Sequence, residues 1–182
     1  ETILAWNGID GIIVFEGKPL NNINNLLNLK LRVGDTYTLD NLAIKVSPMV
    51  DQDKYDYLLI GSYINLVRGE DSIVRAMLTG NPFLWHIYPQ EENAHFDKIN
   101  ALFDRMDEFC FDKESVEILR QLTLSYNGNS DFIHNFDLSS FIEKWKKLSE
   151  EWRDYLLSLG SLTDNLLAFI REKNQFSWLI NP

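Results

Sequence analysis

The side chains best suited to chemistry lie in three short stretches, each running from an apolar segment into the start of a helical pattern. In one of them, residues 67–72 read Val-Arg-Gly-Glu-Asp-Ser. Free backbone N–H groups at a helix start attract phosphate, Ser72 adds a hydroxyl donor, and Arg68 adds a forked cation. This stretch therefore predicts a site for an anionic ligand such as a phosphate.

Glu70 and Asp71 lie in the same stretch, and their negative charges would repel a phosphate. The conflict disappears if the two acids face another part of the ligand, such as sugar hydroxyls or a cationic acceptor. In the alternative interpretation, they form an acidic first turn that complements the helix dipole. The spacing by itself leaves both interpretations open.

The next stretch, residues 85–90, reads Trp-His-Ile-Tyr-Pro-Gln. Alternation along a strand would put His86 and Tyr88 on one face, with Tyr88 and Gln90 at the strand end where a ligand would sit. The alternative is that His86 finds partners within the protein and Tyr88 only packs. Because His86 and His95 have no third ligand at a suitable spacing, we predict no metal site.

The remaining stretch, residues 48–55, precedes and opens a helical pattern with acidic residues in its first turn. Gln52 can pair with the edge of a planar base, and Tyr55 can stack on a ring. Alternatively, Asp51 caps the helix and Tyr55 belongs to the core. Each stretch alone is weak evidence for a ligand site. Their common position along one edge of the expected sheet is stronger evidence.

Apolar patterning predicts four strands that alternate with helices, followed by helices alone from residue 113 onward. Strands are expected at 12–15, 42–46, 63–67 and 83–88, and helices at 19–29, 51–60, 71–78, 91–109, from about 139, and from 161 to about 172. This alternation is typical of an α/β fold with a Rossmann-like, doubly wound, mainly parallel sheet. Ligands of such sheets bind at the carboxyl ends of the strands, where all three stretches fall.

Composition excludes several classes of protein. The chain has 27 acidic and 17 basic residues, a net charge of −10, which makes nucleic acid a poor partner. A single cysteine, Cys110, excludes an internal disulfide and a cysteine-based zinc site. We expect no membrane span and no signal peptide, and therefore a cytoplasmic protein. Glycine-rich dinucleotide, Walker and nucleophile-elbow motifs are absent from the sequence.

Three runs of sequence, at 48–56, 65–76 and 80–95, are similar in order and spacing to the arginine rhamnosyltransferases that modify elongation factor P. The strings Arg-Gly-Glu-Asp-Ser at 68–72 and Trp-His-Ile-Tyr-Pro-Gln at 85–90 carry most of the resemblance, which is strong over about residues 44–103. The resemblance implies the C-terminal half of a glycosyltransferase B fold. It divides the chain into a nucleotide-sugar-binding core at 1–110 and a helical segment of the same domain at 111–182.

By the resemblance, the enzyme transfers L-rhamnose from dTDP-β-L-rhamnose to an arginine of elongation factor P, inverts the anomeric centre and needs no metal or other cofactor. Donor binding would fall to residues of the three stretches: Gln52 and Tyr55 for the thymidine, with Met49 where the family usually has an aromatic residue; Arg68, Asp71, Ser72 and Tyr88 for the ribose and pyrophosphate; and Gln90 on the same rim. Glu70 would lie near the reaction centre. The proposed base and most acceptor contacts belong to an N-terminal domain absent from this chain, which alone should be inactive.

Two alternatives remain open. The same fold could serve a transferase that uses another nucleotide sugar, because the sugar is assigned by resemblance alone. The chain could also be a non-catalytic nucleotide-binding or protein-interaction module that presents its acidic face to a partner.

Overall fold

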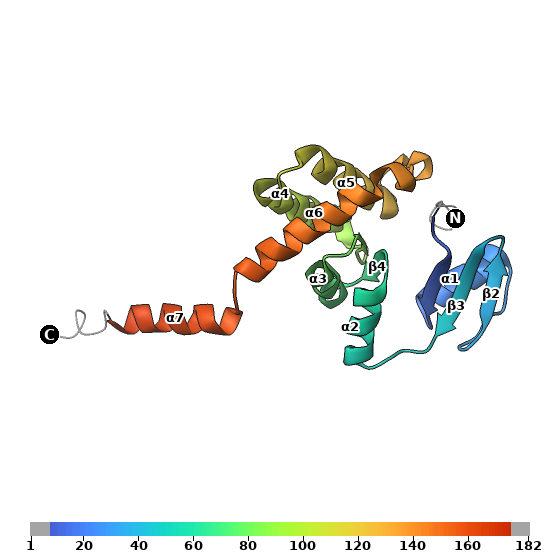
Figure 1. Ribbon diagram of the computed structural model, residues 1–182, viewed down its shortest axis with the longest axis horizontal. Coiled ribbons are helices and arrows are strands. Elements are labelled where there is room, and N and C mark those ends of the chain that lie inside the picture. The colour runs from blue at the N-terminus through green and yellow to red at the C-terminus, as the bar shows by residue number, and fades with distance from the viewer. Residues whose placement is uncertain (1–7, 176–182) are drawn as a thin grey trace.

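The computed structural model describes residues 8–175, in which strands and helices are mixed as far as residue 86 and only helices follow (Figure 1). In chain order the elements are β1 (Gly11–Phe15), α1 (Lys18–Leu27), β2 (Thr36–Leu39), β3 (Leu42–Ser47), α2 (Gln52–Gly61), β4 (Asn65–Arg68), α3 (Glu70–Thr79), β5 (Phe83–His86), the 3-10 helix η2 (Glu91–Asn93), α4 (Ala94–Phe109), α5 (Lys113–Tyr126), the 3-10 helix η3 (Phe132–Asn135), α6 (Leu138–Ser158) and α7 (Leu162–Gln175). The expected α/β class with a helical C-terminal segment is confirmed. The predicted ranges 1–110 and 111–182 reach past the described residues at both ends, and that division remains a prediction.

The strands form two sheets. β1 pairs with β3 in parallel and β2 pairs with β3 antiparallel, while β4 and β5 form a separate parallel pair. The antiparallel strand β2 is absent from the predicted elements, although its Thr-Tyr-Thr-Leu sequence alternates and a two-residue turn joins it to β3. Asp40 in that turn has a φ of 52°, in the left-handed region.

The expected single sheet is thus divided between β1 and β4. A cavity of about 360 Å³ lies between β1 on one side and α2 with β4 on the other, lined mainly by apolar side chains. The two parts are held together by packing, because Ile9 contacts both hydrophobic cores and Phe15 meets Tyr55 edge to face. Figure 1 shows the sheet of β1, β3 and β2 standing beside α2.

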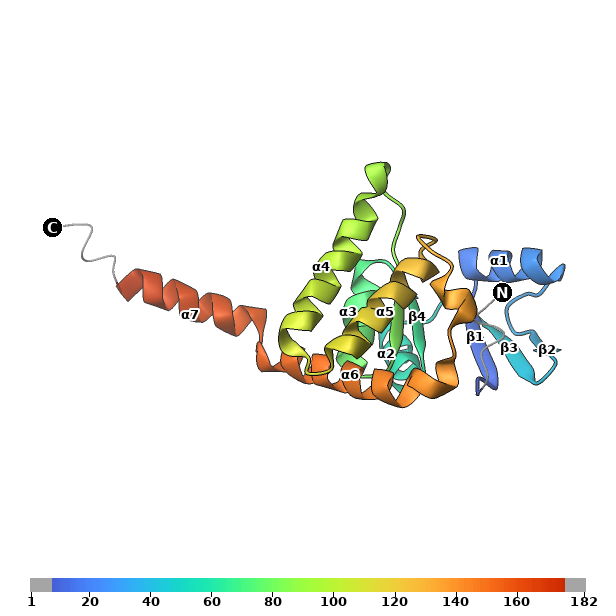
Figure 2. The ribbon, with the colours of Figure 1, turned by 90° about the horizontal axis from the view of Figure 1, so that it is seen from above.

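The larger core lies under the helices that follow β4. Phe83 and Phe103 are fully buried there, and α6 adds Trp145 and Trp152. The indole N–H of Trp152 donates to the Sδ of Met77, 3.0 Å away. Figure 2 shows α6 crossing the ends of α3, α4 and α5, so this helix fixes the three relative to one another.

Most predicted helices begin and end within two residues of their observed bounds, but the helix expected at 91–109 is wrong in its first turn. Glu92 and Asn93 have φ values of 55° and 61°, which separate η2 from α4. The backbone N–H of Gln90 donates to Nδ1 of His95 at 3.3 Å and stabilises this turn. Asparagine adopts the left-handed region more readily than most residues, which favours the break at this position.

The last helix, α7, extends away from the rest of the molecule (Figure 1, Figure 2). Its apolar residues Leu162, Leu166 and Phe169 are exposed. Among the described residues, none of the helices combines the length and apolar character that a membrane span requires.

The side chain of Asn127 stabilises the end of β5. Its Oδ1 accepts the backbone N–H of Ile87 at 3.0 Å, and its Nδ2 donates to the carbonyl of Trp85 at 2.7 Å. The amide therefore pairs with the free edge of β5 as a neighbouring strand would. Because His86 lies between the two bonded residues, Asn127 fixes the backbone that carries it.

Asn127→Ala removes both bonds and leaves a buried N–H and a buried carbonyl of β5 without their partner. We expect the free energy of unfolding to fall by about 1–3 kcal/mol, as measured by urea denaturation. Asn129→Ala changes an exposed residue of the following turn and should stay within about 0.5 kcal/mol of wild type. Equal stability of both variants would contradict a stabilising role of Asn127.

Candidate functional site

The junction between β4 and α3 has the geometry of an anion-binding helix start. Gly69 joins the elements with a φ of 79°, a conformation that favours glycine, and no side chain caps α3. Three other helices are each capped by an aspartate, namely α2 by Asp51, α5 by Asp112 and α6 by Asp137. The first-turn N–H groups of α3 are therefore left without a capping carboxylate, which makes them available to an anionic ligand.

Arg68 and Tyr88, both predicted site residues, are in direct contact beside this junction. The guanidinium carbon of Arg68 lies 4.5 Å from the centre of the Tyr88 ring. The same ring packs over Gly69, because a Cβ there would come within 3.3 Å of it. The ring thus holds the guanidinium next to the start of α3, where its charge adds to the field of the helix.

The acidic residues of the junction each have a cationic partner of their own. Glu70 lies 3.5 Å from Nζ of Lys98 on α4, and Asp71 lies 3.0 Å from Nε of Arg75 one turn along α3. Asp56 on α2 also accepts two hydrogen bonds from Arg75, at 3.1 and 2.9 Å. Arg75 therefore ties α2 to α3.

These partners explain how acids can lie beside a candidate anion site. The bond from Arg75 holds the exposed Asp71 carboxylate and offsets its negative charge beside the helix start. Asp71 also fits the alternative interpretation of an acidic first turn that complements the helix dipole. Ser72 is half-buried in the same turn.

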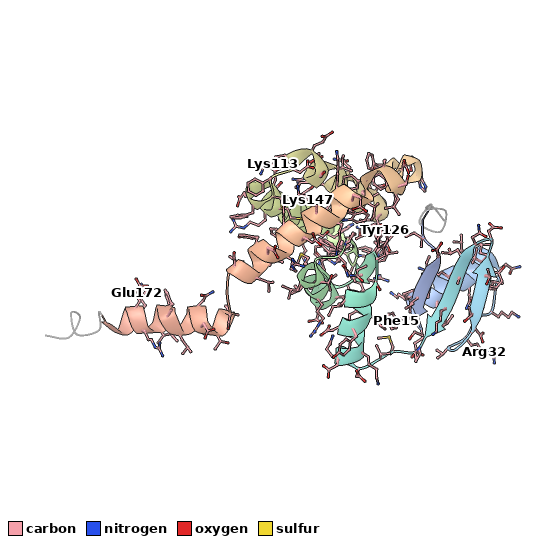
Figure 3. The ribbon with its side chains drawn as sticks, viewed as in Figure 1. Phe15, Arg32, Lys113, Tyr126, Lys147 and Glu172 are labelled. Carbon is pink, nitrogen blue, oxygen red and sulfur yellow. The ribbon has the colours of Figure 1, made fainter. Side chains whose placement is uncertain are left out.

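The start of α2 is only partly arranged as a binding surface. Gln52 is its first residue and is exposed, and the side chain of Met49 is 70% exposed. Asp51 caps the helix, as the alternative interpretation of this stretch had it. Tyr55 meets the ring of Phe15 at a centroid distance of 5.9 Å and lines the cavity between β1 and β4 (Figure 3 labels Phe15).

Sequence reasoning missed several residues that shape this region. Glu16, at the end of β1, accepts the backbone N–H of Met49 at 2.8 Å and so fixes the approach to α2. The pairing of Asp71 with Arg75 follows the i, i+4 spacing and was available from the sequence. Lys98 is distant in the sequence from Glu70, and no local pattern could have indicated it.

His86 is half-buried against the ring of Tyr126, at a centroid distance of 5.5 Å. Burial lowers the pKa of His86, and the nearby cation of Arg68 lowers it further. The imidazole is therefore neutral at neutral pH. Gln90 is exposed, and its backbone bond to His95 sets the direction of the chain after Tyr88.

The predicted residues thus lie at the ends of neighbouring elements. Arg68 and Tyr88 are in contact with each other. Glu70, Asp71 and Ser72 occupy the adjacent helix start, and Arg75 links that helix to α2, which carries Gln52 and Tyr55. Of all these predicted residues, only Tyr55 lines the cavity between β1 and β4.

Known proteins are similar in sequence to most of this chain. The family model of the elongation factor P (EF-P) rhamnosyltransferase EarP matches residues 7–171. A protein-arginine rhamnosyltransferase of Neisseria meningitidis is 35% identical over 143 residues, which are 75% of this chain and 37% of that protein. A protein of the same name from Pseudomonas aeruginosa is 35% identical over 162 residues, 87% of this chain and 42% of that protein.

A solved structure, described as the structural basis for EarP-mediated arginine glycosylation of translation elongation factor EF-P, has a TM-score of 0.76 and 25% sequence identity to this chain. The similarity covers 94% of this chain and 55% of that one. The chain spans about two fifths of the length of the two relatives described above. Since the family model matches nearly the whole of the described fold, the chain belongs to the EF-P rhamnosyltransferase EarP family.

Proposed function

We propose that this chain is the donor-binding part of an inverting glycosyltransferase that moves L-rhamnose from dTDP-β-L-rhamnose to an arginine side chain of EF-P. The relatives that are named protein-arginine rhamnosyltransferases support the reaction class. One observation carries the donor site: Arg68, held by Tyr88, stands beside a helix start that no side chain caps. The positive charge of Arg68 and the dipole of α3 would both stabilise a diphosphate, which would accept hydrogen bonds from the guanidinium and from the first-turn N–H groups.

The other predicted residues complete the proposed donor site. Gln52 and Tyr55, with Met49 beside them, would receive the thymidine at the start of α2. The remaining contacts would come from Asp71 and Ser72 toward the ribose and pyrophosphate, and from Gln90 on the rim next to Tyr88. The link through Arg75 would keep the thymidine and diphosphate ends of the site at a constant separation.

In the proposed transfer, a guanidinium nitrogen of the acceptor bonds to the anomeric carbon while the bond from that carbon to the diphosphate oxygen breaks. The electron pair of the broken bond leaves with dTDP, and Arg68 and the α3 N–H groups would stabilise the new charge without a metal ion. A guanidinium is a poor nucleophile while its charge is delocalised. Glu70 would orient it and localise that charge, and a base would take the proton that the nitrogen loses.

We place that base, and most contacts to EF-P, in the N-terminal domain that the resemblance implies outside this chain. The two halves together would form the glycosyltransferase B fold. The relatives are longer than this chain, which leaves room for such a domain. This chain alone should therefore bind the donor nucleotide without turning it over.

Calorimetric titration of the chain with dTDP, UDP and GDP tests the identity of the donor. We expect dTDP to bind most tightly, because Gln52 and Tyr55 are proposed to contact the thymine base. Equal weak heats for the three nucleotides would contradict selectivity for dTDP.

Arg68→Ala tests the diphosphate site in the same titration. Losing a charge-assisted hydrogen bond should cost about 1.5–3 kcal/mol, which raises the Kd for dTDP about 10- to 100-fold. Arg32→Ala is the control, because Arg32 is exposed beyond the sheet of β1, β3 and β2 (Figure 3). Unchanged dTDP affinity in Arg68→Ala would exclude a role of Arg68 in binding the diphosphate. That result would favour the non-catalytic protein-interaction module.

Glu70→Gln in the full-length enzyme tests the proposed reaction centre. We expect the affinity for dTDP to stay near wild type and turnover to fall about 100-fold or more, as for the loss of a positioned acid or base. Glu114→Gln, in the first turn of α5, is the matched control and should leave turnover unchanged. Near-normal turnover of Glu70→Gln would exclude a catalytic role for this carboxylate.

A further inference from the structure

Two buried nitrogen atoms at the ends of β4 and β5 have no hydrogen-bond partner among residues 8–175. They are Nε of Arg68 and Nδ1 of His86. The two residues are aligned partners in the parallel ladder, so their side chains leave the same face of the sheet side by side. Buried polar atoms almost always have a partner, and two neighbouring exceptions at a proposed ligand site point to a ligand.

The surrounding protein does not supply the missing bonds. The ring of Tyr88 lies over the Arg68 guanidinium, and the ring of Tyr126 meets His86 at an interplanar angle of 79°. These rings pack against the two groups but offer no acceptor in line with the Nε–H of Arg68. One anionic oxygen placed between the strands' ends could accept from both nitrogens.

His86 is also held in place before any ligand binds. Asn127 binds the backbone of the residues on either side of it, and α5 carries both Asn127 and the ring of Tyr126. A donor fixed in this way can meet a ligand with little ordering cost. Fixed donors of this kind are what a site for developing negative charge requires.

The titratable and charged groups that face His86 come from three elements. Arg68 faces it from β4 and His95 from α4, and both disfavour the imidazolium. Tyr126 faces it from α5, where burial raises the pKa of the phenol and keeps it neutral. The imidazole of the free protein is therefore neutral, and in the tautomer with hydrogen on Nδ1 it donates from that atom. A bound anion would cancel the effect of the Arg68 cation.

We propose that His86 is a further donor-binding residue, which contacts the diphosphate of the nucleotide sugar together with Arg68. This inference rests on the proposed function, because it takes its ligand from the donor site. His86 then stabilises the departing diphosphate directly, while Asn127 acts through His86 as a positioning residue.

The test compares dTDP with thymidine, which lacks the diphosphate, as ligands of the 182-residue chain. His86→Phe should raise the Kd for dTDP about tenfold, as expected for one lost hydrogen bond to a charged group, and leave the Kd for thymidine unchanged. His86→Asn keeps a hydrogen-bonding side chain and should lose less affinity than His86→Phe. His134→Phe makes the same change at an exposed histidine of η3 and is the control.

A second measurement uses the wild-type chain and does not depend on whether a variant folds. The chain has three histidines, so their imidazole signals can be followed separately by NMR during a pH titration. Addition of dTDP should raise the pKa of His86, because a nearby anion favours the charged imidazole, and thymidine should not. The imidazole signals of His134 should not respond to either ligand.

The outcomes separate this inference from the proposed function. If the wild-type chain does not bind dTDP, the donor site itself is wrong. If it binds dTDP but the pKa of His86 does not move and His86→Phe binds as wild type, only the role of His86 is overturned. An equal loss of dTDP and thymidine affinity in His86→Phe would also overturn it, because that result indicates a structural effect.

Discussion

The parallel pairing of β4 with β5 is the constraint on which the rest of the site depends. In this pair Arg68 is aligned with His86, and both strands end at the same edge. The turn at Gly69 then starts α3 at that edge, and the chain leaving β5 brings the Tyr88 ring back over Arg68. A shift of one residue in the pairing would turn these side chains to opposite faces of the sheet.

Packing far from the site maintains this pairing. The core under α6 holds α3 and α5 against the two strands, and Asn127 completes the free edge of β5. The two-stranded sheet is too small to be stable alone, so its geometry is set by the helices around it. The larger core thus fixes the start of α3, which binds the anion in the proposed function. Of the predicted site residues, only the partly buried Tyr55 packs against this core.

The arrangement of charge explains how an acidic chain can offer the proposed anion site. The chain carries a net charge of −10, yet the acids nearest the proposed diphosphate site are matched by Lys98 and Arg75. Arg68 forms no salt bridge among the described residues, so its charge remains available to a ligand. Local pairing, more than the total charge, determines which ligand such a surface can accept.

Local patterns in the sequence indicated most of the elements and a type of chemistry. Apolar runs indicated strands ending at Val67 and Tyr88, within two residues of the observed ends, and the string around Gly69 indicated a helix start suited to phosphate. Only the tertiary structure decided the division of the sheet between β1 and β4, the partners Lys98 and Asn127, and the alignment of His86 with Arg68. The physical reason is that periodicity and capping act over a few residues, whereas these contacts join residues that only the packed core brings together.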